Sequence, residues 1–119
     1  MRKHLTKAQR QMIYDKYGGH CAYCGCELKI SDMQIDHIQA DYVGGKSDMS
    51  NYNPSCRMCN FYKSTFPIEM FRIQIMGIVD RLRKVFIFRL AERYGLIESR
   101  DRQRPLKFYF EETQVRGGK

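Results

Sequence analysis

The sequence predicts a small α+β domain held together by a metal ion bound to cysteines. The chain has 119 residues, the size of one ordinary domain. Apolar residues recur at helical spacing near both ends, whereas the middle shows a short strand-like alternation between loops rich in glycine and asparagine. Two Cys-x-x-Cys pairs, Cys21–Cys24 and Cys56–Cys59, bracket that middle region. Because so polar a centre buries little apolar surface, a structural metal ion would help the chain fold.

The charge balance predicts a polyanionic partner. There are 21 Lys and Arg residues against 13 Asp and Glu, a formal net charge of +8. The basic residues are spread along the chain, which favours a charged face over a disordered basic arm. Nucleic acid is the commonest such partner, and a basic protein without one is the alternative. We expect no membrane association, because no apolar run is long enough to span a bilayer. The basic N-terminus lacks an apolar signal core, so a cytoplasmic location is expected.

The first half of the chain suggests a helix, a strand and a loop. Residues 5–17 fit a helix with Thr6 as its N-cap and Gly18-Gly19 at its end. Residues 34–38 alternate as a short strand. Residues 39–50 carry the residue types of a loop, and a second, short helix is expected to begin at the second cysteine pair.

The second half predicts mostly helix. A long helical segment is expected over residues 66–95, where Pro67 can open it, Gly77 can divide it and Gly95 can end it. Alternating apolar residues predict a late strand over residues 106–110. The helical segment is expected to buttress the core. An exposed part of its apolar face could instead form a dimer, so the choice between monomer and homodimer stays open.

The paired cysteines indicate a structural zinc site. A Cys-x-x-Cys turn aims two thiolates at one point, and two such turns complete a closed tetrahedron. We expect the ligands to be Cys21, Cys24, Cys56 and Cys59. Cys26 fits a plain thiol better than a fifth ligand, and His20 ranks below the four cysteines. Four unrelated reduced cysteines are the alternative interpretation.

Polar residues near and between the pairs could form a second site. The candidates are Asp36, His37, Asn51, Asn53 and Asn60. Oxygen donors suit a hard cation such as Mg²⁺, and a single His suits proton transfer. A metal ion and an imidazole together can hydrolyse a phosphodiester. In a regular strand Asp36 and His37 point to opposite faces, so they share a site only if the strand ends or bends there. The alternative is a packed or solvent-facing His with turn-forming Asn residues.

In order and spacing, these residues resemble the HNH (ββα-metal) endonucleases, specifically the subgroup with a four-cysteine zinc site. The motifs that carry the resemblance are Cys21-x-x-Cys24, Asp36-His37-Ile38, Gly44-Gly45, Asn51, Cys56-x-x-Cys59-Asn60 and Lys63. The resemblance covers roughly residues 18–64. It implies one nuclease domain over residues 1–119, with a ββα-metal, treble-clef-like core.

The resemblance implies a role for each residue of the second site. His37 would be the general base, and Asp36 and Asn60 would hold the catalytic metal ion. Asn51 would pin the loop and help to orient His37. Asn60 stands where many members have a His, which favours Mg²⁺ or Mn²⁺ over softer ions. The spacing to the second cysteine pair favours Asn51 over Asn53 as the central Asn.

The resemblance also implies DNA as the partner, with the helix of the ββα unit along the minor groove. Arg57 and Lys63 would contact phosphates, and a solvated surface charge is the alternative for each. Tyr42, Tyr52 and Tyr62 could lie near the substrate or pack in the core. The expected function is a metal-dependent DNA endonuclease of phage or mobile-element type, which nicks or cuts both strands. A zinc-dependent DNA-binding module without catalysis is one alternative, and an RNA-directed or toxin-like nuclease is another.

Overall fold

The computed structural model describes residues 5–39, 49–98 and 106–117, with side chains described to residue 113 in the last range. These residues fall into two compact units. The first consists of Met1–Ile68 and Lys107–Lys119, and the second of Glu69–Leu106. Within the described ranges, every helix is too short or too polar to cross a bilayer.

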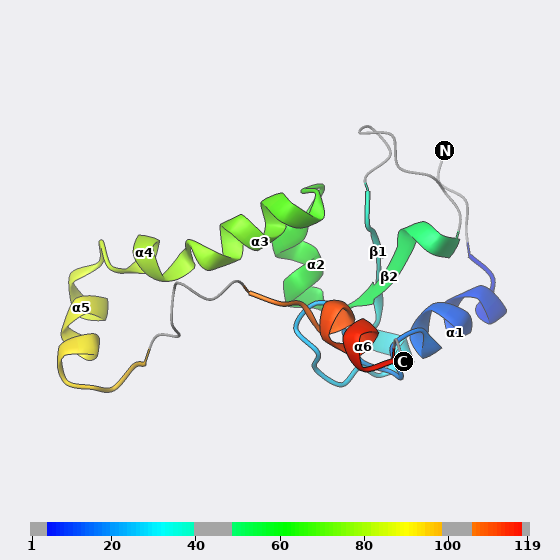
Figure 1. The fold of residues 1–119 in the computed structure, drawn as a ribbon, viewed down its shortest axis with the longest axis horizontal. Helices are drawn as coiled ribbons and strands as arrows, with labels where there is room; N and C mark the ends of the chain where they lie inside the picture. Colours follow the sequence, from blue (N-terminus) through cyan, green and yellow to red (C-terminus); the bar gives the residue numbers. More distant parts are fainter. Residues whose placement is uncertain (1–4, 40–48, 99–105, 118–119) are drawn as a thin grey trace. The chain divides into compact units, whose positions relative to one another are not determined.

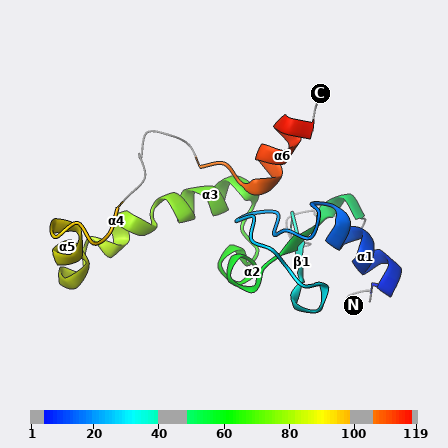
Figure 2. The ribbon, with the colours of Figure 1, turned by 90° about the horizontal axis from the view of Figure 1, so that it is seen from below.

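The first unit is built on two short strands and the helix that follows them. Strand β1 (Gln34–His37) pairs antiparallel with β2 (Tyr52–Ser55), and α2 (Arg57–Lys63) comes directly after β2. The register places Asp36 opposite Asn53 and His37 opposite Tyr52. In Figures 1 and 2 the strands run between α1 on one side and α2 on the other. This small sheet with its helices confirms the expected α+β class.

Strand β2 is the element that the residue pattern did not predict, because it contains Pro54. A proline cannot donate a hydrogen bond to a sheet, so it is normally confined to edge positions. Here the Pro54 carbonyl accepts a hydrogen bond from the Ala22 amide at 2.9 Å, on the side away from β1. In an antiparallel strand the N–H and C=O of one residue point to the same side. An N–H at Pro54 would point away from β1, so the β1–β2 ladder loses no hydrogen bond through this proline.

Helix α1 (Lys7–Asp15) closes one side of the first unit. The expected N-cap is confirmed, because the Thr6 side chain accepts from the Gln9 amide while the Gln9 side chain accepts from the Thr6 amide. This reciprocal arrangement satisfies two amides at the helix start. The Ile13 side chain of α1 is buried and packs with Met33 and Tyr52. These three residues form the apolar core cluster. Short 3-10 turns, η1 (Ile30–Asp32) and η3 (Met49–Asn51), lead into the two strands.

The predicted late strand over residues 106–110 is wrong. The chain enters helix α6 (Tyr109–Gly117) instead. The Glu111 side chain accepts from the Phe108 amide at 2.8 Å, and the Phe108 carbonyl accepts from the Glu111 and Glu112 amides. Phe108 thus acts as the helix N-cap. The alternating aromatic residues that suggested a strand pack against another ring instead, because Phe108 and Phe110 both contact the Tyr23 ring edge-on.

The second unit is helical, but in separate pieces. Its helices are α3 (Ile68–Met76), α4 (Ile78–Leu82) and α5 (Phe86–Arg93). Gly77 divides α3 from α4, as predicted. Gly95, with φ of 74°, ends α5, and the amides of Gly95 and Leu96 bond back to the Glu92 and Ala91 carbonyls. This is the glycine-terminated C-cap that the sequence predicted.

Candidate functional site

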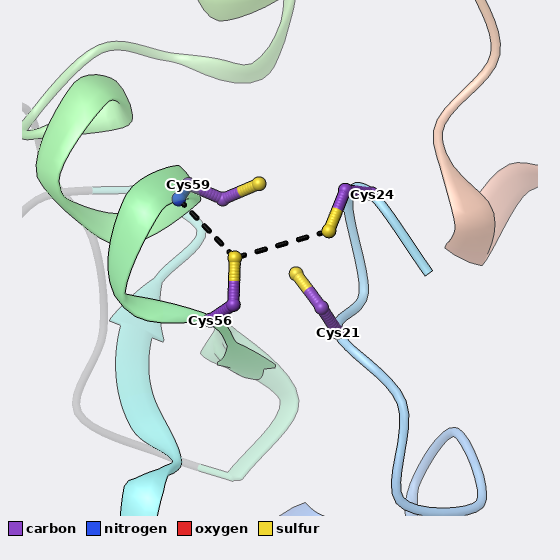
Figure 3. Close-up of side chains that lie close together, drawn as sticks. All are labelled: Cys21, Cys24, Cys56 and Cys59. Atoms are coloured by element: carbon purple, nitrogen blue, oxygen red, sulfur yellow. Dashed lines mark hydrogen bonds between the residues drawn. The ribbon is translucent and has the colours of Figure 1, made fainter. Parts of the chain in front are cut away.

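Four cysteine sulfurs gather at one point of the first unit. All four lie within 4.8 Å of one another, and they belong to Cys21, Cys24, Cys56 and Cys59. The first two come from the loop after α1 and the last two from the start of α2, with their sulfur atoms turned toward one another (Figure 3). The predicted cluster of four thiols is therefore present in the structure.

Backbone amides build the two turns that carry these sulfurs. The Gly25 amide donates to the Cys21 carbonyl at 3.0 Å, and Gly25 has a φ of 83°, which suits glycine and few other residues. The Tyr23 amide donates to Cys21 Sγ at 3.4 Å. In the second turn the Cys59 amide donates to Cys56 Sγ, also at 3.4 Å. Each turn therefore directs one N–H group at a sulfur and stabilises negative charge on it.

The electrostatics of the cluster fit a bound cation. A hydrogen bond from Cys59 and backbone amides together lower the pKa of Cys21 to about 4. The same contact and burial raise the pKa of Cys59, because one thiolate hinders the ionisation of the next. Tetrahedral zinc with bonds of about 2.3 Å separates its sulfurs by roughly 3.8 Å. Cys24 Sγ and Cys56 Sγ lie 3.8 Å apart, so the cluster is compatible with structural zinc.

The two weaker ligand candidates lie outside this cluster. Cys26 is exposed and is not among the four clustered sulfurs. His20 Nδ1 lies 3.2 Å from the Tyr17 carbonyl oxygen, and its ring stands 5.2 Å from that of Tyr109. Neither residue is one of the four mutually close ligands, although the Cys26 thiol contacts that of Cys24.

Asp36 and Lys63 form a buried ion pair beside the cysteine cluster. Lys63 Nζ lies 3.2 Å from Asp36 Oδ2, and the two side chains are 0% and 3% exposed. Lys63 Nζ also donates to the carbonyls of His37 at 3.0 Å and Ile38 at 3.4 Å. The predicted contact of Lys63 with DNA phosphate is wrong for this structure, because its charged group is surrounded by protein oxygens.

A third side chain completes the environment of Asp36. The Tyr23 hydroxyl donates to Asp36 Oδ2 at 2.6 Å and accepts from Asn53 Nδ2 at 3.2 Å. Burial raises the pKa of Asp36, while Tyr23, Lys63 and His37 act in the opposite direction. Among the described residues both close contacts fall on Oδ2, so Oδ1 is the oxygen that a cation could bind. Sequence reasoning missed Tyr23, although a tyrosine inside a Cys-x-x-Cys turn offers a hydroxyl close to the cysteine cluster.

Asn60 is placed by its position on α2. It precedes Lys63 by three residues, so the two side chains leave the same face of the helix. Lys63 shows that this face is directed at the end of β1. Asn60 is half-buried there. Its amide oxygen and the Asp36 carboxylate are the kinds of donor that Mg²⁺ or Mn²⁺ prefers.

His37 is the last residue of β1 and is half-buried. Its ring packs edge-on against Tyr52, the residue opposite it in β2, with centroids 5.0 Å apart. In a regular strand this ring would point to the face opposite Asp36. The strand ends at His37, which was the condition for the two residues to serve one site.

Asn51 fixes the chain just after His37. Its side chain accepts from the Gln39 amide and donates to the Gln39 carbonyl, both at 2.9 Å. Its own carbonyl accepts from the Ile38 amide at 2.8 Å. Asn53, by contrast, is buried beneath Tyr23. The geometry agrees with Asn51, and not Asn53, as the residue that pins the loop.

The remaining candidates lie on α2, in β2 or outside the described residues. Arg57 is exposed at the first position of α2, and Met58 and Phe61 beside it are more than four-fifths exposed. Tyr52 is buried, whereas Tyr62 is exposed. Tyr42 and Gly44-Gly45 lie outside the described residues.

Comparison with known proteins finds a family that the central stretch resembles. Residues 21–66 match the family model described as HNH endonuclease. A curated relative from Bacillus subtilis strain 168 bears the name "SPbeta prophage-derived putative HNH endonuclease YoqL". The two are 37% identical over an alignment of 79 residues, and the match covers 57% of this chain and 34% of the relative. The chain thus spans about a third of the length of that relative.

A solved structure shares the fold. The crystal structure of the type II-C Cas9 enzyme from Actinomyces naeslundii superposes with a TM-score of 0.51 and 25% sequence identity. The match covers 63% of this chain and 8% of the Cas9 chain. The similarity therefore concerns one small part of a much larger enzyme.

Proposed function

We propose that this chain is a metal-dependent endonuclease that hydrolyses phosphodiester bonds in DNA, because residues 21–66 match the family model described as HNH endonuclease. The family match supports a nuclease or DNA-binding role, and the charge of +8 supports a nucleic-acid partner. The choice of catalysis over binding rests on the geometry at the end of β1.

The observation that carries this choice is the way the backbone from His37 to Gln39 is held. Lys63 binds the carbonyls of His37 and Ile38 from the side of α2. Asn51 binds the amide of Ile38 and both polar backbone groups of Gln39 from the side of β2. Three consecutive residues are thus fixed immediately around the imidazole. Such fixation is what a proton-transfer group requires, since misplacement by about 1 Å costs a large part of the rate.

In the proposed reaction His37 acts as the general base. Its imidazole takes a proton from a water molecule, whose oxygen forms a bond to phosphorus as the bond to the leaving sugar oxygen breaks. The leaving oxygen takes up a proton from solvent. Asp36 Oδ1 and the Asn60 amide oxygen would hold a divalent ion, whose Lewis acidity stabilises the charge on the phosphate and leaving oxygens.

The outer side of α2 is proposed to meet the DNA. Arg57 stands exposed at the first position of this helix, where its guanidinium can bind a phosphate. Because Asn60 follows Arg57 by one turn of the same helix, a phosphate bound by Arg57 lies close to the proposed metal ligands. With one such site among the described residues, a single copy would nick, and two copies could cut both strands.

The competing function is a zinc-dependent DNA-binding module without catalysis. It accounts for the cysteine cluster and the charge, but gives no role to the fixed backbone around His37. The test uses supercoiled plasmid and zinc-loaded protein, with and without added Mg²⁺ or Mn²⁺. We expect nicked or linear product only when the divalent ion is present. A shift of plasmid mobility without any nicking in either ion would favour the binding module, and preferential cleavage of a matched RNA would favour an RNA-directed nuclease.

A further inference from the structure

Two donors bind one oxygen of Asp36, and each lies in or shortly after a different cysteine pair. Tyr23 lies between Cys21 and Cys24 in the first turn, and Lys63 follows Cys59 by four residues on α2. Their polar atoms reach Asp36 Oδ2 at 2.6 Å and 3.2 Å. The carboxylate is thus held between the two chain segments that a zinc ion in the cluster would bring together.

Tyr23 is itself immobilised on all sides. Its side chain is 3% exposed and packs edge-on against Phe108 and Phe110, at centroid distances of 5.4 Å and 6.0 Å. Its carbonyl accepts from the Tyr109 amide at 2.9 Å, and Asn53 donates to its hydroxyl. A rigid donor fixes the orientation of its acceptor, whereas a mobile one would not.

We propose that Tyr23 and Lys63 are positioning residues that transmit the geometry of the cysteine cluster to the Asp36 carboxylate and the end of β1. This inference rests on the proposed function, because it concerns Asp36 as a ligand of the catalytic ion. Outer partners of this kind orient a ligand before the ion arrives, and their loss typically lowers metal affinity by about 10- to 100-fold. The cysteine cluster therefore holds the chain together and also aims an oxygen that contributes to the reaction.

The test replaces Tyr23 by Phe, which removes the hydroxyl and keeps the ring against Phe108 and Phe110. Tyr14→Phe is the matched control. The Tyr14 hydroxyl also makes a 2.6 Å hydrogen bond, to the Leu28 carbonyl, but it belongs to α1 and does not contact Asp36. Mn²⁺ binding is measured by the electron paramagnetic resonance signal of the free ion, with zinc-loaded protein, in the absence and presence of a DNA duplex. Zinc content and thermal midpoint are measured on the same samples.

We expect Tyr23→Phe to bind Mn²⁺ at least about 10-fold more weakly than wild type. Its zinc content and thermal midpoint should equal those of Tyr14→Phe. Equal Mn²⁺ affinity in both variants and wild type would overturn the inference and leave the proposed function intact. Loss of zinc from Tyr23→Phe would also overturn it, because the hydroxyl would then support the cluster and not Asp36. Wild-type protein that neither takes up Mn²⁺ nor nicks plasmid would refute the proposed function itself.

Discussion

Lys63 Nζ and Asp36 Oδ2 lie 3.2 Å apart, and protein covers both side chains. A buried lysine is rare unless it is paired, and here it also binds two carbonyl groups at the end of β1. The pair joins α2 to the strand that carries His37. The positive charge that the sequence suggested for DNA is used inside the protein.

Removal of the lysine should therefore destabilise the fold. Lys63→Met keeps much of the side-chain volume but leaves the Asp36 carboxylate buried without its cation, a change that costs about 3–5 kcal/mol. Arg57→Met, an exposed change on the same helix, should alter the free energy of unfolding by no more than about 0.5 kcal/mol. Urea unfolding of the zinc-loaded variants measures both. Adding Asp36→Asn to Lys63→Met should recover part of the loss, and equal stability of Lys63→Met and Arg57→Met would show that the pair contributes nothing.

The cysteine cluster should be essential for folding, and the fifth cysteine should not. Cys56→Ser removes one of the four clustered sulfurs, so we expect it to lose both zinc and helical signal, because metal binding and folding are coupled. Cys26→Ser changes an exposed thiol outside the cluster and should keep about one zinc ion per chain. Elemental analysis with circular dichroism checks both variants. A folded, zinc-loaded Cys56→Ser protein would refute the four-cysteine site.

Arg57 should bind DNA through its charge. Arg57→Ala should weaken binding to all duplex sequences alike and reduce the slope of log affinity against log salt by about 0.9, the value for one lost phosphate contact. Arg57→Lys keeps the charge and should keep the slope. Fluorescence anisotropy over a range of salt concentrations measures this. An unchanged slope in Arg57→Ala would place the phosphate contact elsewhere on the protein.

Asn60 should decide which cation supports the reaction. Asn60→His exchanges an oxygen donor for an imidazole, which binds Ni²⁺ and Zn²⁺ more readily than Mg²⁺. We expect the ratio of plasmid nicking in Ni²⁺ to nicking in Mg²⁺ to rise relative to wild type. The same ranking of ions in both proteins would argue that Asn60 does not contact the metal ion.

The sequence predicted the elements that local signals determine. Thr6 specified the start of α1, and Gly77 and Gly95 specified breaks in the helical segment, because capping and backbone freedom depend on local residue type. The paired cysteines specified the metal cluster, because their spacing constrains the geometry.

Features that depend on distant contacts could not be predicted. Strand β2 contains a proline whose carbonyl is used by Ala22, more than thirty residues earlier. Phe108 and Phe110 alternate as in a strand but pack against Tyr23 from the start of a helix. From the sequence alone Lys63 is expected at the surface, because a lysine is buried only where a partner compensates for the lost hydration. That partner is Asp36, which lies next to Lys63 only in the folded chain.

The most direct test of the proposed endonuclease is plasmid nicking by His37→Ala. The substitution removes the imidazole at the end of β1 and leaves the cysteine cluster and the Asp36–Lys63 pair untouched. In Mg²⁺ or Mn²⁺ we expect the nicking rate to fall by about 10²- to 10⁴-fold, with zinc content, thermal midpoint and DNA affinity equal to those of wild type. A folded His37→Ala protein that nicks plasmid at the wild-type rate would contradict the assignment of His37 as the general base.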